Sequence, residues 1–110
     1  MQSDFPTGTV TFLFTDVEGS TALLREMGAE EYGRALAEHR RQLREAFSAH
    51  GGVEVDTQGD ALFWAFPTAV GAVAAAGAGQ AGLTGGPIRV RMGVHTGEGH
   101  LGDEGYIGQD

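Results

Sequence analysis

Apolar and polar residues alternate along two segments of the chain, and both segments are predicted to be β-strands. Residues 9–15 are β-branched and aromatic, with apolar side chains at positions 10, 12 and 14. Residues 88–95 alternate in the same way. Between them, residues 53–56 and 61–66 flank the turn Thr57-Gln58-Gly59-Asp60, which predicts a hairpin.

Helices are predicted over residues 22–27, over residues 29–50, and from residue 67 to about residue 83. Gly19-Ser20-Thr21 starts the first helix and Gly28 ends it. The second helix has its large apolar side chains on one face and stops at Gly51-Gly52. The third helix belongs to a stretch from Ala61 to Ile88 that has no charged residue. This stretch exceeds the ~20 residues of a membrane span. Its glycines and alanines make it only weakly apolar, so we expect a buried strand and a small-residue helix.

The elements follow the order β-α-α-β-β-α-β, and a glycine-rich hairpin from Gly97 to Gly105 comes last. This order is typical of a ferredoxin-like α+β sandwich, with helices on one face of a mostly antiparallel sheet. A chain of 110 residues is expected to form a single domain, residues 1–110, with a modest core. Trp64 and the neighbouring phenylalanines are predicted to lie in that core.

Composition excludes several classes of site. The formal charge of −8 and the pI near 4.8 argue against sequence-independent binding to nucleic acid or to anionic membranes. The chain has no cysteine, which excludes disulfides and thiolate metal sites, and no lysine, which excludes a mechanism that needs one. The first residues lack the basic start and apolar run of a signal peptide, so a cytoplasmic location is expected.

Two aspartates framed by glycines are the strongest candidates for chemistry. Asp16 follows the first apolar strand and precedes the turn and helix start at Gly19-Ser20-Thr21. Asp60 follows Gly59 at the root of another apolar strand. Two carboxylates on neighbouring strands beside a helix N-terminus are suited to divalent cations and a polyphosphate.

Three motifs carry a resemblance to a known family: residues 11–21, the pair Gly59-Asp60, and residues 90–97. Together they resemble the catalytic domain of class III nucleotidyl (adenylate or guanylate) cyclases, over roughly Gly8 to Gly108. The resemblance implies a phosphorus–oxygen lyase that converts ATP or GTP to a 3′,5′-cyclic nucleotide and pyrophosphate. It also implies a homodimer, in which the active sites form between the two protomers.

The same resemblance assigns roles to individual residues. It implies two Mg²⁺ or Mn²⁺ ions held by the carboxylates of Asp16 and Asp60 and by the backbone carbonyl of Val17. It places Gly19, Ser20 and Thr21 against the β- and γ-phosphates. The family's purine-selecting lysine is replaced here by Asp56, and its second purine-selecting position holds Gly105. The choice between ATP and GTP therefore stays open.

The family's transition-state asparagine and arginine lie on a helix after the point where this chain ends, Asp110. We therefore expect a C-terminally incomplete domain that binds metal and nucleotide with little or no turnover, and further domains in the native protein. The alternative is a degenerate, non-catalytic module for dimerisation or nucleotide sensing within a larger regulator. The altered purine positions favour this alternative, whereas the intact Asp16 and Asp60 oppose it.

The remaining polar residues have structural interpretations. His95 is expected on an open sheet face. A solvated helix face is predicted for Arg40, Arg41 and Arg44, and exposure to solvent for Glu98, Asp103 and Glu104.

Overall fold

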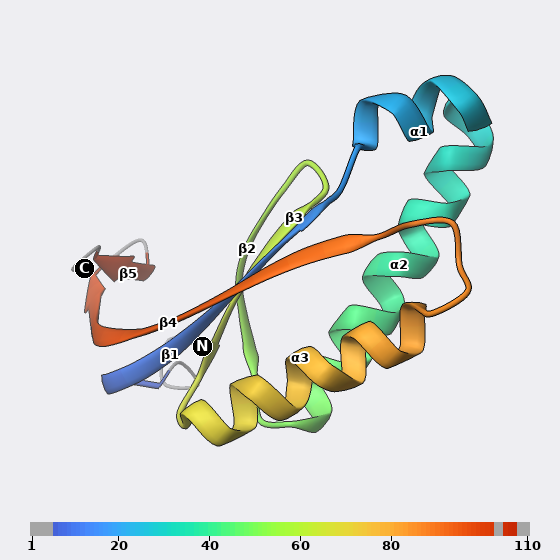
Figure 1. Ribbon diagram of the computed structural model, residues 1–110. Coiled ribbons are helices and arrows are strands. Elements are labelled where there is room, and N and C mark those ends of the chain that lie inside the picture. Colours follow the sequence, from blue (N-terminus) through green and yellow to red (C-terminus); the bar gives the residue numbers. More distant parts are fainter. Residues whose placement is uncertain (1–5, 103–104, 108–110) are drawn as a thin grey trace.

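The computed structural model describes residues 6–102 and 105–107, and the side chains up to residue 98. The strands are β1 (Gly8–Val17), β2 (Val53–Gln58), β3 (Ala61–Phe66), β4 (Val90–Gly102) and β5 (Gly105–Ile107). The helices are α1 (Ser20–Met27), α2 (Ala29–Ala49) and α3 (Ala69–Leu83). The strands form an antiparallel sheet in the order β2-β3-β1-β4-β5, with α2 and α3 beside it (Figure 1). The predicted α+β sandwich is thus confirmed.

The main difference from the predicted elements lies in β4. This strand begins at Val90 instead of Ile88 and continues to Gly102, so the predicted terminal hairpin is formed by the end of β4 with β5. The extension pairs with the start of β1, through Val10 with Gly97 and Gly8 with Gly99. The long edge of β1 offers backbone partners that keep this glycine-rich segment extended, in spite of its weak intrinsic β-propensity.

The two faces of β1 carry different residues because side chains alternate along a strand. Leu13 faces the helices and packs with Leu43 and Phe47 of α2 and with Trp64 of β3. The ring of Phe47 meets that of Trp64 edge-on, with centroids 5.4 Å apart. Phe12, by contrast, faces the open side of the sheet, in a smaller cluster with Val10 and Ala65.

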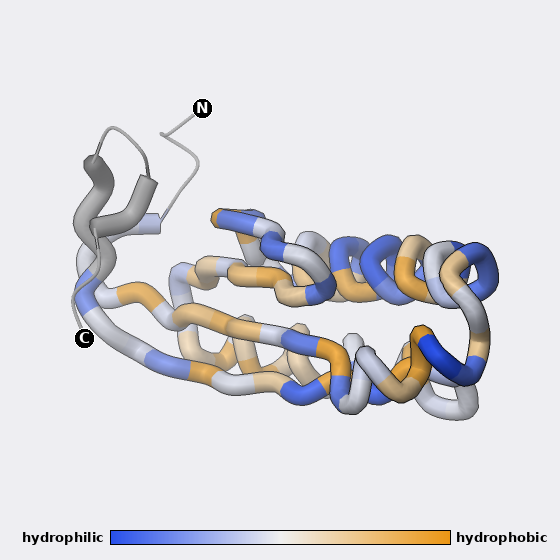
Figure 2. The backbone as a smooth tube through the Cα atoms, turned by 90° about the horizontal axis from the view of Figure 1, so that it is seen from above, coloured by the Kyte–Doolittle hydropathy of each residue, from blue (hydrophilic) through white to orange (hydrophobic). Residues whose placement is uncertain are grey.

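Helix α2 buries one face, on which large side chains recur every four positions. His39, Leu43 and Phe47 are buried there, and the residues between them are polar or small. Figure 2 shows this as hydrophilic and hydrophobic positions that alternate along the helical layer.

Helix α1 has no buried residue and extends beyond the sheet (Figure 1). No helix within the described residues combines the length and hydropathy needed to cross a membrane.

Glycine allows α3 to approach α2 and β4 closely, and this yields a matched prediction. A Cβ on the buried Gly79 would lie 2.8 Å from Cδ2 of Leu43 and 3.2 Å from Cε of Met92, whereas a Cβ on Gly77 would meet nothing within 4 Å. Gly77→Ala should raise the free energy of unfolding by up to about 1 kcal/mol. Gly79→Ala should lower it by about 1 kcal/mol, because overpacking outweighs the gain in propensity. Urea denaturation measures both, and equal gains would contradict the close approach.

Candidate functional site

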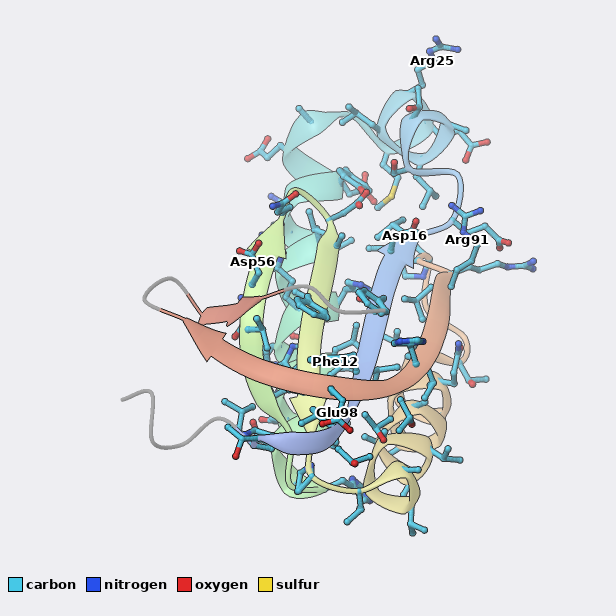
Figure 3. All side chains as sticks on the ribbon, turned by 90° about the vertical axis from the view of Figure 1, so that its left-hand side faces the viewer. Phe12, Asp16, Arg25, Asp56, Arg91 and Glu98 are labelled. Carbon is cyan, nitrogen blue, oxygen red and sulfur yellow. The ribbon has the colours of Figure 1, made fainter. Side chains whose placement is uncertain are left out.

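Asp16 lies near the end of β1 on the open face of the sheet, opposite Arg91 of β4 in the strand register. The two side chains form a forked pair, with Nε to Oδ1 at 3.1 Å and Nη2 to Oδ2 at 3.3 Å. Figure 3 shows them side by side at one end of the sheet. Both remain accessible to solvent, since the exposed fractions of their side chains are 49% for Asp16 and 64% for Arg91. The pair is therefore open to exchange of partners.

A hollow of about 530 Å³ adjoins this pair on the open face. Phe14 and Phe63 line it and stack on each other, with centroids 4.7 Å apart and planes 12° apart. Asp16 and Arg91 border the hollow from β1 and β4, and Asp56 borders it from β2. Aromatic faces beside charged groups suit a ligand that combines a planar ring with an ionic end.

Asp60 lies in the turn between β2 and β3, at the same end of the sheet as Asp16. The strand register pairs Thr15 with Leu62, and its continuation puts Asp16 opposite Ala61, next to Asp60. Asp60 is partly buried. Burial raises the pKa of Tyr32 on α2 and the charge of Asp60 adds to that rise, whereas burial lowers the pKa of His39 and the charge of Asp60 only partly opposes this. Asp60 is not among the residues that line the hollow. The two aspartates thus share an end of the sheet, and the structure records no contact between their carboxylates.

The turn after β1 provides unpaired backbone donors. Gly19 adopts a left-handed conformation, with φ 64°, and no side chain of the described residues caps α1 there. The first N–H groups of a helix have no partner within the helix, so those of the Ser20-Thr21 turn are free to bind an anion. Val17, just before this turn, is buried and pairs with Val90.

The two positions assigned to base selection lie on different strands. Asp56 is exposed on β2, where its carboxylate accepts hydrogen bonds from the backbone N–H of Thr57 at 2.8 Å and from Nε2 of Gln58 at 3.1 Å. Gly105 begins β5 and pairs with Gly102.

Other predictions concern residues farther along β4 and after it. His95 is exposed on the open face, opposite Phe12, as expected. Glu98 is exposed and accepts a hydrogen bond from Oγ1 of Thr9 at 3.3 Å. Asp103 and Glu104 lie outside the described residues.

The expected solvated arginine face is wrong for two of its three members. Arg41 is exposed and pairs with Glu38 and Glu45. Arg44 instead reaches Glu54 of β2 with a forked pair at 3.1 and 3.0 Å. Arg40 donates a hydrogen bond to the carbonyl of Gly59. Since β2 and its turn lie against α2, these two arginines tie the helix to the hairpin that carries Asp60.

Sequence reasoning missed two features of the site. Arg91 was not singled out, although it belongs to the alternating segment that was recognised as a motif. The phenylalanines near Trp64 were all expected in the core, but Phe63 is partly exposed in the hollow, whereas Trp64 and Phe66 are buried. Strand alternation could have signalled this, because Phe14 shares a face with Asp16 and Phe63 pairs with Phe14.

Burial of His39 predicts a pH dependence of stability. Its side chain is 2% exposed, and desolvation, helped by the charge of Arg40 and opposed by Asp60, lowers its pKa in the folded state. In the unfolded chain the pKa of histidine is about 6.5. Below that value the unfolded state binds the proton more readily, so the free energy of unfolding should fall as the pH drops from 7 to 5.5. Urea denaturation across this range measures the slope.

Two histidine variants control this prediction. His39→Leu should flatten the slope between pH 7 and 5.5, because it removes the buried imidazole. His50→Leu should leave the slope unchanged, since His50 is exposed at the end of α2. A steep slope that persists in His39→Leu would assign the effect to another group.

Comparisons with known proteins agree with this geometry. Residues 3–108 match the family model described as the adenylate and guanylate cyclase catalytic domain. An uncharacterised protein of Mycobacterium tuberculosis is 44% identical over 106 residues, which cover 94% of this chain and 36% of that protein. An adenylate cyclase of Lachancea kluyveri is 40% identical over 68 residues, or 62% of this chain and 4% of that enzyme. The chain thus spans little more than a third of its mycobacterial relative.

The fold is shared with solved cyclase structures. A Trypanosoma brucei adenylate cyclase, solved in its monomeric state, superposes with a TM-score of 0.79 at 26% identity. The match covers 93% of this chain and 64% of that one. The family model covers nearly the whole sequence, and the element order and sheet of this chain agree with the solved structures. The chain therefore belongs to the adenylate and guanylate cyclase catalytic domain family.

Proposed function

We propose that this chain is the substrate-binding part of a nucleotidyl cyclase, which converts ATP or GTP to a 3′,5′-cyclic nucleotide and pyrophosphate. The observation that carries the proposal is the exchangeable Asp16–Arg91 pair beside the hollow lined by Phe14 and Phe63. This arrangement offers an aromatic surface for a base and ionic groups for a metal-bound triphosphate.

The donor set fits Mg²⁺ or Mn²⁺. Both ions prefer oxygen ligands and commonly use one or two carboxylates, with phosphate oxygens and waters completing the shell. Asp16 and Asp60 would supply the carboxylates, and the carbonyl of Val17 a further oxygen. The described residues gather no group of three or more His, Asp or Glu side chains, which agrees with a shell that substrate must complete. Bound ions would activate the ribose 3′-oxygen and offset charge on the leaving pyrophosphate.

The chain's own residues would orient the triphosphate. With the Asp16 carboxylate engaged by a metal ion, Arg91 would be free of its partner, and its guanidinium could bind phosphate oxygens in a forked geometry. The free N–H groups of the first turn of α1, from Gly19 to Thr21, would bind the β- and γ-phosphates. Both groups belong to segments that flank Asp16, on β4 and after β1.

The base would lie against the stacked rings of Phe14 and Phe63. Asp56, at the rim, can accept hydrogen bonds from N–H groups of a purine, where the family's lysine would donate them. A second copy of the chain is proposed as the partner on the ground of the family resemblance. The alternative function is a non-catalytic module for dimerisation or nucleotide sensing, which the carboxylate at Asp56 favours.

Calorimetric titration tests the proposal. The chain is titrated with non-hydrolysable ATP and GTP analogues, with Mn²⁺ and with a chelator, beside the double variant Asp16→Ala/Asp60→Ala. We expect binding that requires Mn²⁺ and disappears in the double variant. Glu26→Gln removes one exposed acid on α1 and should bind like the original chain. Absence of Mn²⁺-dependent binding by folded protein would refute the proposed site and leave the dimerisation module.

A further inference from the structure

The turn that carries Asp60 is held by a side chain of helix α2. Gln58 pairs with Ala61, so Gly59 and Asp60 alone form the turn between β2 and β3. Nη2 of Arg40 donates a hydrogen bond to the carbonyl of Gly59. Arg40 is partly buried and its Nε is fully enclosed, so the side chain is packed against its surroundings instead of moving freely in solvent.

A held carbonyl at Gly59 also fixes where Asp60 begins. The atoms of a peptide unit lie in one plane, and the plane that contains the Gly59 carbonyl also contains the Cα of Asp60. Glycine has wide conformational freedom, so Gly59, with φ 58°, restrains this plane only weakly by itself. The hydrogen bond from Arg40 therefore restricts the position from which the Asp60 side chain projects.

This arrangement leaves the carboxylate of Asp60 available. None of the ion pairs in the described part of the chain involves Asp60, and Arg40 binds the backbone of the turn instead. Burial lowers the pKa of His39, the charge of Arg40 adds to this, and the charge of Asp60 opposes it. Both charges thus act on one side chain of α2 without a direct pair between them. Asp60 keeps its capacity to bind a cation while its backbone is anchored.

A second arginine holds the same hairpin farther from its turn. Arg44, one helical turn after Arg40, forms a forked pair with Glu54 at 3.1 and 3.0 Å, and its Nη2 lies 3.4 Å from Oγ1 of Thr57. Residues four apart lie on one face of a helix, so both arginines reach the hairpin from the same side of α2. Arg41, between them, pairs with two glutamates of its own helix. Arg44 thus anchors strand β2, and Arg40 anchors the turn beyond it.

We propose that Arg40 is a positioning residue for the metal site, because it holds the Gly59–Asp60 turn where the Asp60 carboxylate can share a divalent cation with Asp16. This inference rests on the proposed function, which makes the two aspartates the metal ligands. Arg40 acts through the turn and contacts neither metal nor nucleotide. A cationic side chain near a metal site repels the metal ion, so a positioning role and a simple charge effect change the affinity in opposite directions.

Arg40→Met keeps the length of the side chain and removes its donors and its charge. Calorimetric titration with Mn²⁺ and a non-hydrolysable ATP or GTP analogue compares this variant with the original chain and with Arg41→Met. We expect Arg40→Met to weaken Mn²⁺-dependent binding by about ten-fold, the lower end of the loss when groups that support metal ligands are removed. Arg41→Met removes the same charge from the same helix and should bind as tightly as the original chain or slightly more tightly. Unchanged or tighter binding by Arg40→Met would overturn the proposal.

A double-variant cycle shows whether Arg40 acts through Asp60. In a chain that already carries Asp60→Asn, Arg40→Met should weaken binding no further, because the ligand that it positions is gone. A further ten-fold loss there would assign the effect to the fold as a whole and overturn the positioning role. Should Arg40→Met fail to fold, the shorter Arg40→Gln replaces it in both comparisons. If the folded original chain itself shows no Mn²⁺-dependent binding, the proposed function is refuted, and the metal role of Arg40 with it.

Discussion

Asp16→Asn should weaken Mn²⁺-dependent binding of a nucleoside triphosphate analogue by about 100-fold or more. Loss of residues that merely support metal ligands costs 10- to 100-fold in affinity, so loss of a ligand carboxylate is expected to cost at least as much. The substitution conserves side-chain size, and Asp16 is half-exposed, so the fold should persist. Calorimetry with and without Mn²⁺ measures the change, and circular dichroism checks the fold.

Arg91→Gln should have the opposite effect on the affinity for the metal ion alone. Asp16 loses the cation that neutralises it at 3.1 Å, so Mn²⁺ without nucleotide should bind more tightly than in the original chain. The triphosphate should bind more weakly, because its forked partner is gone. If Arg91→Gln weakens both Mn²⁺ and nucleotide, the pair serves to hold the strand ends together, and our assignment of Arg91 fails.

Phe47→Ala should lower the free energy of unfolding by about 3–5 kcal/mol, the range for removal of a buried aromatic ring. Phe47 is 0% exposed, and its ring meets Trp64 and Phe66 edge-on, at 5.4 and 6.2 Å between centroids. The cavity would open where α2 packs on the sheet. Because small domains are stable by only about 5–15 kcal/mol, the variant should lose much of its resistance to urea.

Phe14→Ala is the matched control for this prediction. Phe14 stacks on Phe63 at 4.7 Å, but it is 45% exposed on the open face, so its removal should cost clearly less. Urea denaturation compares the two variants under the same conditions. Equal losses would mean that the open face contributes as much to stability as the helical side, which contradicts the distribution of buried residues.

The open face links stability to the proposed function. A ring as exposed as Phe14 beside an aromatic neighbour and an ion pair contributes little to the isolated fold, yet it provides surface for a ligand or a second copy. The helical face, in contrast, holds the larger core cluster. This division explains why the candidate site occupies the open face, where side chains remain free to change partners.

Local patterns predicted most of the helices and strands and the positions of the two aspartates of the site. The alternation in residues 9–15 predicts a strand and the pair Gly59-Asp60 predicts a turn, and each pattern spans only a few residues. Gly28 and Gly51 end helices through their backbone conformations. These signals also placed Asp16 at the end of a strand and Asp60 at a turn. The metal and phosphate roles of these residues came from resemblance, and they stay predictions.

The sequence by itself determined the order of the elements, the α+β class and the ends of the strands that present Asp16 and Asp60. Tertiary structure decided the rest: the Asp16–Arg91 pair across 75 residues of chain, the aromatic hollow of Phe14 and Phe63, and the burial of His39 with no hydrogen-bond partner in the described part of the chain. The physical reason is that strand order, register and helix packing choose the neighbours of a side chain. Those choices depend on contacts between distant segments, which no local pattern of residues contains.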